Sequence, residues 1–96
     1  MNELMKFFIK NPNIVSRKIA GEVILVPIRK NVGDLESIYT LNEVAARIWE
    51  LIDGKRKIGE IEKVITDEFD ITSEKAERDI EDLLRQLVKI GAITKG

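Results

Sequence analysis

The chain has 96 residues, a formal net charge of −1, 44% hydrophobic residues and 34% charged residues, which is the composition of one small folded domain. It contains no cysteine and no histidine, which excludes disulfides, zinc–thiolate sites and most hydrolytic or acyl-transfer machinery, so we expect neither an enzyme nor a bound cofactor. The balanced charge does not favour binding to nucleic acid or to an anionic membrane. No apolar run is long enough to span a bilayer, and we expect a cytoplasmic protein.

The first half of the chain is typical of β structure. Residues 14–20 and 22–28 are rich in β-branched side chains and meet at Gly21, which predicts a hairpin. The second of these segments is apolar on both faces, which favours a central strand. A loop at residues 29–36 and a short third strand at residues 37–41 follow.

The second half of the chain has helical periodicity. Apolar residues recur at helical spacing in residues 43–52, 58–69 and 74–90, which predicts three helices, and residues 92–95 add a last extended segment. The apolar arc of the third helix covers roughly half of its circumference. Either this helix packs against both other helices and the sheet, or one of its edges lines a groove, and the sequence does not say which edge.

The predicted helix ends carry capping residues. The first helix is capped by Asn42, or by Thr40 in a capping box with Glu43. Thr72 or Ser73 caps the third helix. The helices stop at residues that favour a left-handed turn, namely Gly54 and Gly91.

The order of these elements resembles a winged helix-turn-helix, in which the third helix often binds DNA. The third helix begins with five acidic side chains against two basic ones, namely Glu74, Glu77, Asp79, Glu81 and Asp82 against Lys75 and Arg78. Acidic residues suit the N-terminus of a helix, but they repel phosphates in a major groove. A winged-helix DNA-binding regulator is therefore an alternative that the sequence does not favour.

Three further features of the sequence are candidate sites. Residues 67–70 are acidic but lack the spacing and the glycine of a calcium loop, so no metal site is predicted. The basic run at residues 54–57, with Arg56, is better interpreted as a solvated loop than as a phosphate contact. Trp49 is better interpreted as a core residue than as a binding hot spot.

The third strand is the strongest binding candidate. In a meander of three strands, the first and the third are both edges, and an uncovered edge offers unpaired N–H and C=O groups. An extended peptide can add itself there as a fourth strand. The same edge can instead be covered by the N-terminal residues of the chain or by a second copy in a homodimer.

The run from Tyr39 to Ile61, followed by residues 76–93, resembles the PqqD-like family, named after the pyrroloquinoline quinone biosynthesis protein D. The resemblance covers about residues 13–94. The matching features occur in order and at the correct spacing: Leu41-Asn42, Ile48-Trp49, Asp53-Gly54, Ile58, Ile61, Asp79-Ile80, Leu83-Leu84, Leu87 and Gly91-Ala92-Ile93.

This resemblance implies a recognition element for the precursors of ribosomally synthesised, post-translationally modified peptides. Members have a winged-helix-like α+β fold, with a three-stranded antiparallel sheet followed by a three-helix bundle. They are non-catalytic, bind the leader segment of a precursor peptide and present the peptide to a modifying enzyme, often a radical S-adenosylmethionine protein. The leader docks as an added strand on strand three, beside helix three.

Transferred by position, the resemblance gives a set of peptide-binding candidates. On the strand they are Ser37, Ile38, Tyr39 and Thr40, and on the third helix Leu84, Arg85 and Val88. Lys57 departs from the family, which often has a helix-capping Thr or Ser there. The expected organisation is a single domain over residues 1–96, with an N-terminal extension (1–12), a β-meander (13–41) and three helices (42–91). The precursor, the enzyme, the pathway and the possibility of a homodimer are left open.

Overall fold

The computed structural model of the protein describes residues 3–27 and 39–96. Two short elements come first, the 3-10 helix η1 (Glu3–Met5) and the strand β1 (Phe8–Lys10). The meander consists of β2 (Ile14–Ile19), β3 (Glu22–Pro27) and β4 (Tyr39–Leu41). The last four elements are α1 (Glu43–Leu51), α2 (Ile58–Phe69), α3 (Ser73–Lys89) and β5 (Ile93–Lys95). The predicted loop at residues 29–36 lies outside the described residues.

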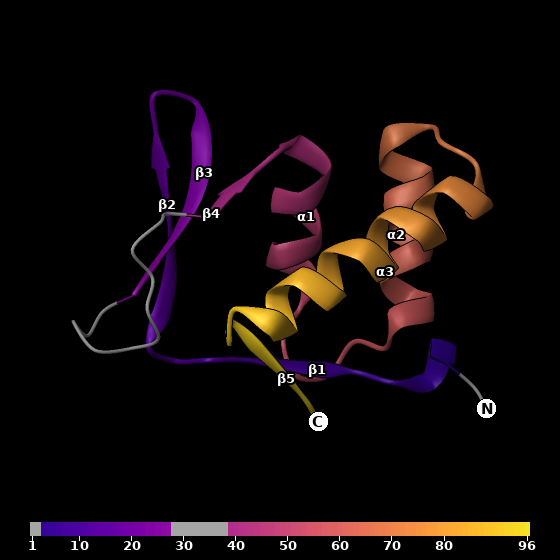
Figure 1. Cartoon of the computed structure of the whole chain (residues 1–96). Helices are drawn as coiled ribbons and strands as arrows, with labels where there is room; N and C mark the ends of the chain where they lie inside the picture. Colours follow the sequence, from indigo (N-terminus) through magenta and orange to yellow (C-terminus); the bar gives the residue numbers. More distant parts are fainter. Residues whose placement is uncertain (1–2, 28–38) are drawn as a thin grey trace.

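The meander forms an antiparallel sheet in the order β2-β3-β4, which stands beside the three helices (Figure 1). Ala20 and Gly21 join β2 to β3 with φ angles of 53° and 84°. Two positive φ angles are typical of the tight turn that suits a two-residue hairpin, and glycine adopts them without strain. β3 is central, with Leu25 2% exposed and Ile24 9% exposed. The predicted hairpin and central strand are therefore confirmed.

The three predicted helices are confirmed, each within one residue of its expected ends. Asn42 caps α1, because its side-chain oxygen accepts a hydrogen bond of 2.8 Å from the N–H of Ala45. Thr72 caps α3 in the same way, at 3.1 Å from the N–H of Lys75. The alternative capping box that begins at Thr40 is wrong, because Thr40 belongs to β4 and lies two residues before the cap of α1.

The C-terminus of α3 is closed by a Schellman motif. Gly91 has a φ of 79°, and its N–H donates to the carbonyl of Val88 at 3.0 Å. The N–H of Ala92 donates to the carbonyl of Leu87 at 2.8 Å. This pattern of two bonds is the one that a glycine after the last helical residue favours, and it turns the chain into β5.

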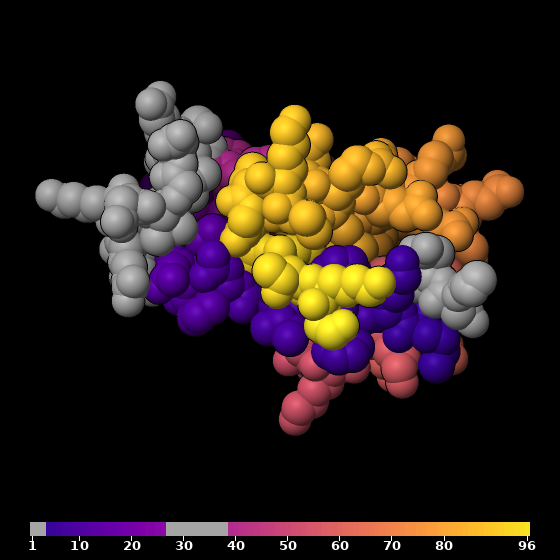
Figure 2. Space-filling view, turned by 60° about the horizontal axis from the view of Figure 1, so that its bottom comes forward, coloured from indigo at the N-terminus to yellow at the C-terminus, as the bar shows by residue number. Residues whose placement is uncertain are grey.

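The N-terminal segment pairs with the C-terminus of the chain. β1 and β5 form a two-stranded antiparallel sheet, and the two segments lie side by side in Figure 2. The carbonyl of Lys6 accepts a hydrogen bond of 2.8 Å from the N–H of Ile58 at the start of α2. Lys57 has no side-chain acceptor for a cap, and Glu60 instead accepts from its N–H at 2.8 Å. The described part of the extension therefore packs on α2 and β5, and not on β4.

A single hydrophobic core joins the inner face of the sheet to all three helices. Its members include Leu25, Leu41, Ile48, Ile65, Ile80 and Leu87. Trp49 belongs to the core and is 3% exposed, with the ammonium of Lys10 4.7 Å from the centre of its ring. Burial lowers the pKa of that ammonium, although Glu50 and Asp53 oppose the shift. The core interpretation of Trp49 is confirmed, and this packing fixes where α1 and α3 stand relative to β4.

Candidate functional site

β4 is an edge strand. In the part of the chain that the structure describes, it pairs only with β3, in the register Leu25↔Tyr39, Ile24↔Thr40 and Val23↔Leu41. Opposed residues point to the same face of a sheet, so Tyr39 and Leu41 face the core, whereas Thr40 faces the other side. Backbone groups of an edge strand also point away from its neighbour. These groups are available to a further strand, because no other described strand pairs with β4.

A groove of about 410 Å³ lies along this edge, between β4 and α3, and we call it the β4–α3 groove. The strand and the residue after it contribute Tyr39, Thr40, Leu41 and Asn42. α1 contributes Val44, Ala45 and Ile48, and the turn before α3 contributes Ile71. α3 contributes Lys75, Asp79, Asp82, Leu83 and Gln86. The open strand edge and the groove thus form one continuous surface.

The groove has an apolar part and a charged part. Ile48 and Leu83 are core residues at its base, 1% and 7% exposed, with Ile71 half-buried beside them. Charged side chains on α3 form the opposite wall, where Lys75 contacts Asp79 at 3.3 Å. Asp82 contacts Arg85 at 3.2 Å. Such a surface offers hydrophobic contact below and polar contact along one side.

Two of the four predicted strand residues are described, and both line the groove. Tyr39 is half-buried and Thr40 is exposed. Ser37 and Ile38 lie outside the described residues. The strand residues therefore remain a prediction, with Tyr39 and Thr40 placed beside the groove.

The three predicted helix residues lie elsewhere on α3. Leu84 is 6% exposed in the core, Val88 is 49% exposed, and the Arg85 side chain is exposed. None of them is among the residues that line the groove. At 3.6 residues per turn, Val88 points about 180° away from Asp79. The groove gives these three residues no support as contacts for a peptide on β4.

The sequence does not single out the helix residues that do line the groove. They are Lys75, Asp79, Asp82, Leu83 and Gln86, which recur at spacings of three and four along one stripe of α3. The stripe mixes charged and apolar residues, so periodicity alone classes it as the border of a solvated face. The position of β4 is what identifies it as a wall of a groove.

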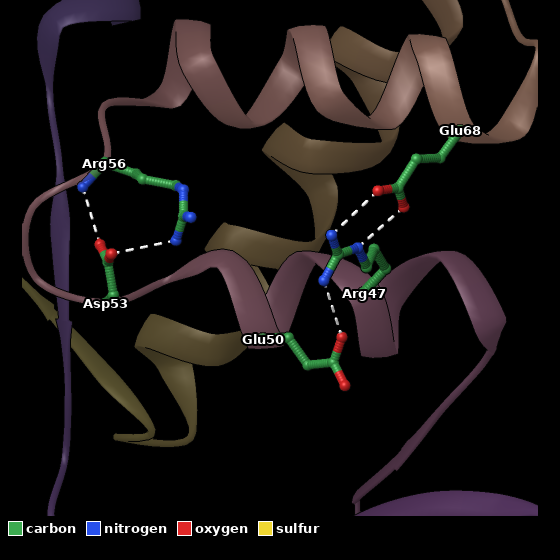
Figure 3. Close-up of polar contacts among 5 residues, drawn as sticks. All are labelled: Arg47, Glu50, Asp53, Arg56 and Glu68. Carbon is green, nitrogen blue, oxygen red and sulfur yellow. Dashed lines mark hydrogen bonds and ion pairs between the residues drawn. The ribbon is translucent and has the colours of Figure 1, made fainter.

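A second, larger hollow of about 870 Å³ lies between the β2–β3 hairpin and α1, and Arg47 lines it. The Arg47 guanidinium donates to both carboxylate oxygens of Glu68, at 2.8 Å and 2.9 Å, and to Glu50 at 3.0 Å (Figure 3). The bonds from Arg47 hold the pKa of Glu68 below its usual range, and the bonds to Glu68 and Glu50 raise the pKa of Arg47. This arginine therefore ties α1 to α2.

The basic loop after α1 is held by Asp53. One of its carboxylate oxygens accepts from the N–H of Arg56 at 2.8 Å and from that of Lys55 at 2.9 Å. The other contacts the Arg56 guanidinium at 3.0 Å (Figure 3). These bonds lower the pKa of Asp53, and the bond from the N–H of Arg56 makes the largest contribution. Arg56 is thus engaged within the loop, in keeping with the interpretation as a solvated loop.

The described residues contain no group of three acidic side chains placed to hold a metal ion. No described helix has the length and apolar character needed to cross a membrane. The β4–α3 groove offers three kinds of contact, namely with a strand edge, with an apolar base and with an acidic wall. Such a site suits the binding of an extended peptide.

Two solved structures share this fold. The structure of TbiB1 in complex with the TbiA(beta) leader peptide matches with a TM-score of 0.71 and 27% sequence identity, and the match covers 88% of this chain and 93% of that chain. A lasso peptide synthetase B1, complexed with the leader peptide, matches with a TM-score of 0.73 and 23% identity, and covers 91% of this chain and 96% of that chain. At this lower identity, the second match supports the fold alone.

The family of the chain follows from its sequence. No curated protein is a significant match. The family model described as coenzyme PQQ synthesis protein D (PqqD) matches residues 22–93, which span β3, β4, all three helices and the start of β5. The matched region includes every residue that lines the β4–α3 groove. The chain therefore belongs to the PqqD family.

Proposed function

We propose that this chain binds the leader segment of a ribosomally synthesised precursor peptide and presents the peptide to a modifying enzyme, without catalysing the modification itself. The observation that carries the proposal is the open edge of β4 beside the β4–α3 groove, in a chain 27% identical to a protein whose structure contains a leader peptide. The partner enzyme is a radical S-adenosylmethionine protein or another enzyme that modifies peptides.

The mode of binding that fits this surface is strand addition. Main-chain hydrogen bonds to the edge of β4 hold the peptide in an extended form, and alternate side chains enter the groove. The protein then contributes proximity: by holding the leader, it raises the local concentration of the attached core peptide at the active site of the enzyme. This role needs no reactive group in the groove.

The test uses the leader encoded by the small open reading frame nearest to the gene. Amide resonances of the protein are followed by NMR while this peptide is added, with a scrambled peptide of the same composition as the control. Shifts centred on Tyr39, Thr40 and the groove side of α3 support the proposal. Shifts confined to other surfaces, or equal shifts with the scrambled peptide, contradict it.

Two neighbouring alanines on α1 provide a matched pair of variants. Ala45 lines the β4–α3 groove, whereas Ala46 lines the hollow beside the hairpin, and both are half-buried. Ala45→Glu places a charge in the groove and should weaken leader binding at least about tenfold. Ala46→Glu makes the same change one residue away and should leave the affinity within about twofold. Equal effects would place the peptide elsewhere.

Two other functions make different predictions. A winged-helix regulator would retard DNA in a gel at low salt, where even non-specific binding is visible, but α3 carries an acidic wall at the groove. A dimerisation module would have the edge of β4 occupied by a second copy of the chain. Sedimentation with and without the leader separates that case, because a permanently paired edge leaves no place for the peptide.

A further inference from the structure

One wall of the β4–α3 groove is acidic. Asp79 and Asp82 line it from α3, and Lys75 is the one cation among its described lining residues. The facing wall, formed by β4 and Asn42, carries no Asp, Glu, Lys or Arg. The lining residues therefore include two carboxylates and one ammonium, all on the helix side, and the cation that pairs with Asp82 lies outside the groove lining.

The ion pairs of this wall are open to exchange. Lys75 and Asp79 have side chains that are 59% and 35% exposed, and those of Arg85 and Asp82 are 72% and 71% exposed. Each pair lies within a single helix, and solvent-exposed pairs of this kind contribute little to stability. A cationic side chain of a bound peptide can therefore compete for either carboxylate without breaking the fold.

The base of the groove is apolar. Ile48 and Leu83 present the edge of the hydrophobic core there, next to Ile71. An apolar side chain of a peptide gains free energy by covering this surface, whereas a charged one loses hydration. The groove thus offers two different contacts, an apolar base and an acidic wall.

We infer that the β4–α3 groove selects leader peptides in which an apolar residue and a lysine or arginine are separated by one residue. The inference rests on the proposed function. Successive side chains of an added strand alternate between the faces of the sheet. Residues i and i+2 of the peptide enter the groove, where one covers Leu83 and the other reaches Asp79 and Asp82, while residue i+1 points to the opposite face of the sheet.

The probe is a displayed library of random 12-residue peptides, selected for binding to the wild-type chain. A second selection uses the double variant Asp79→Asn with Asp82→Asn, which keeps the shape of the wall and removes its charge. A third uses Asp67→Asn with Asp70→Asn as the matched control. The control raises the net charge by the same amount at exposed positions that do not line the groove.

The wild type and the control should enrich an apolar residue two positions from a Lys or Arg, and the groove variant should enrich the apolar residue alone. A wild-type-selected peptide should bind the groove variant about tenfold more weakly, and this difference should shrink at high salt because mobile ions screen exposed charges.

Three results overturn the inference. The first is that peptides selected with the wild type shift the resonances of Tyr39 and Thr40 but carry no basic residue. This result overturns the inference and leaves the proposed function intact. The second is that the control variant also stops selecting peptides with a basic residue. The preference for basic peptides would then come from the net charge of the protein and not from the groove. Failure to select any peptide that maps to the groove, together with failure of the natural leader to bind, overturns both proposals.

Discussion

The cap of α1 joins β4 to the helices, and its replacement is a sharp test of the structure. Asn42→Ala removes the oxygen that accepts the N–H of Ala45 at 2.8 Å. Loss of such a cap costs about 1 kcal/mol, which is a large share of the roughly 5–15 kcal/mol that holds a domain together. For a chain of this length, the melting temperature should fall by about 4–8 °C.

Two further variants isolate the cause. Asn42→Asp keeps the acceptor and adds a negative charge at the N-terminus of α1, where the helix dipole favours it, so its stability should equal or exceed that of the wild type. Thr40→Val leaves the cap intact and should change the free energy of unfolding by no more than about 0.5 kcal/mol. Urea denaturation followed by circular dichroism measures all three variants.

The outcomes separate the two caps that the sequence allows. If Thr40→Val lost as much stability as Asn42→Ala, the helix would be capped from β4, and the placement of the strand relative to α1 would be wrong. If Asn42→Asp lost as much as Asn42→Ala, the acceptor would not be the source of the effect.

Three further substitutions test the core, a helix end and a carboxyl group. Ile80 is fully buried, so Ile80→Ala should lower the free energy of unfolding, measured by urea denaturation, by about 2–5 kcal/mol. Ile19 is 55% exposed, so Ile19→Ala should change the same free energy by no more than about 0.5 kcal/mol. Gly91 has a φ of 79° and open space around it, so Gly91→Ala should lower the free energy of unfolding by about 1–2 kcal/mol through backbone strain alone. Gly91→Asn should lower it less in the same assay, because asparagine adopts a positive φ more readily than alanine does. Burial, and secondarily Glu77, raise the pKa of Glu62 above its ordinary value of 4.5, so the folded state loses stability as the pH rises from that value through the raised pKa. Glu62→Gln should therefore raise the melting temperature at pH 7, and the gain should vanish below the ordinary carboxyl pKa; a gain that persists there would exclude the ionisation of Glu62 as its cause.

Local chemistry accounts for the elements that the sequence predicts correctly. Gly21 provides the turn of the hairpin, and periodic apolar residues define each helix. Gly91 ends α3 because it adopts a left-handed conformation at little cost. These features depend on residues a few positions apart, and for that reason they can be read from sequence.

The pairing of the two ends of the chain is a different case. β1 and β5 have three residues each, which is too short for a clear alternation of polar and apolar residues. They are held by contacts across the whole chain, such as the bond of 2.9 Å from the Asn11 side chain to the carbonyl of Gly91. Sequence periodicity carries no information about contacts between residues so far apart.

The helix residues that line the groove cannot be identified from the sequence for a related reason. The apolar pattern of α3 includes Val88, yet Val88 is 49% exposed, whereas Asp79 and Asp82 look like ordinary surface residues and line the groove. A helical wheel gives the angle of each side chain about the axis, but not the direction in which the neighbouring strand lies. That direction comes from the packing of α1 and α3 in the core, which depends on the whole sequence.

The described residues of β4 supply only part of the free energy that binding of a peptide at this edge would require. The three described residues of β4 can form only a few backbone hydrogen bonds with an added strand, each worth about 1 kcal/mol net. An apolar side chain in the groove adds about 1.5–3 kcal/mol, and association costs at least about 4 kcal/mol. For the described residues alone, these terms fall well short of the roughly 8 kcal/mol that a micromolar complex requires. Backbone bonds are moreover the same for every extended peptide. On the proposed mode of binding, discrimination between leaders comes from side-chain contacts, and Leu83, Asp79 and Asp82 are the described groups that we propose supply them.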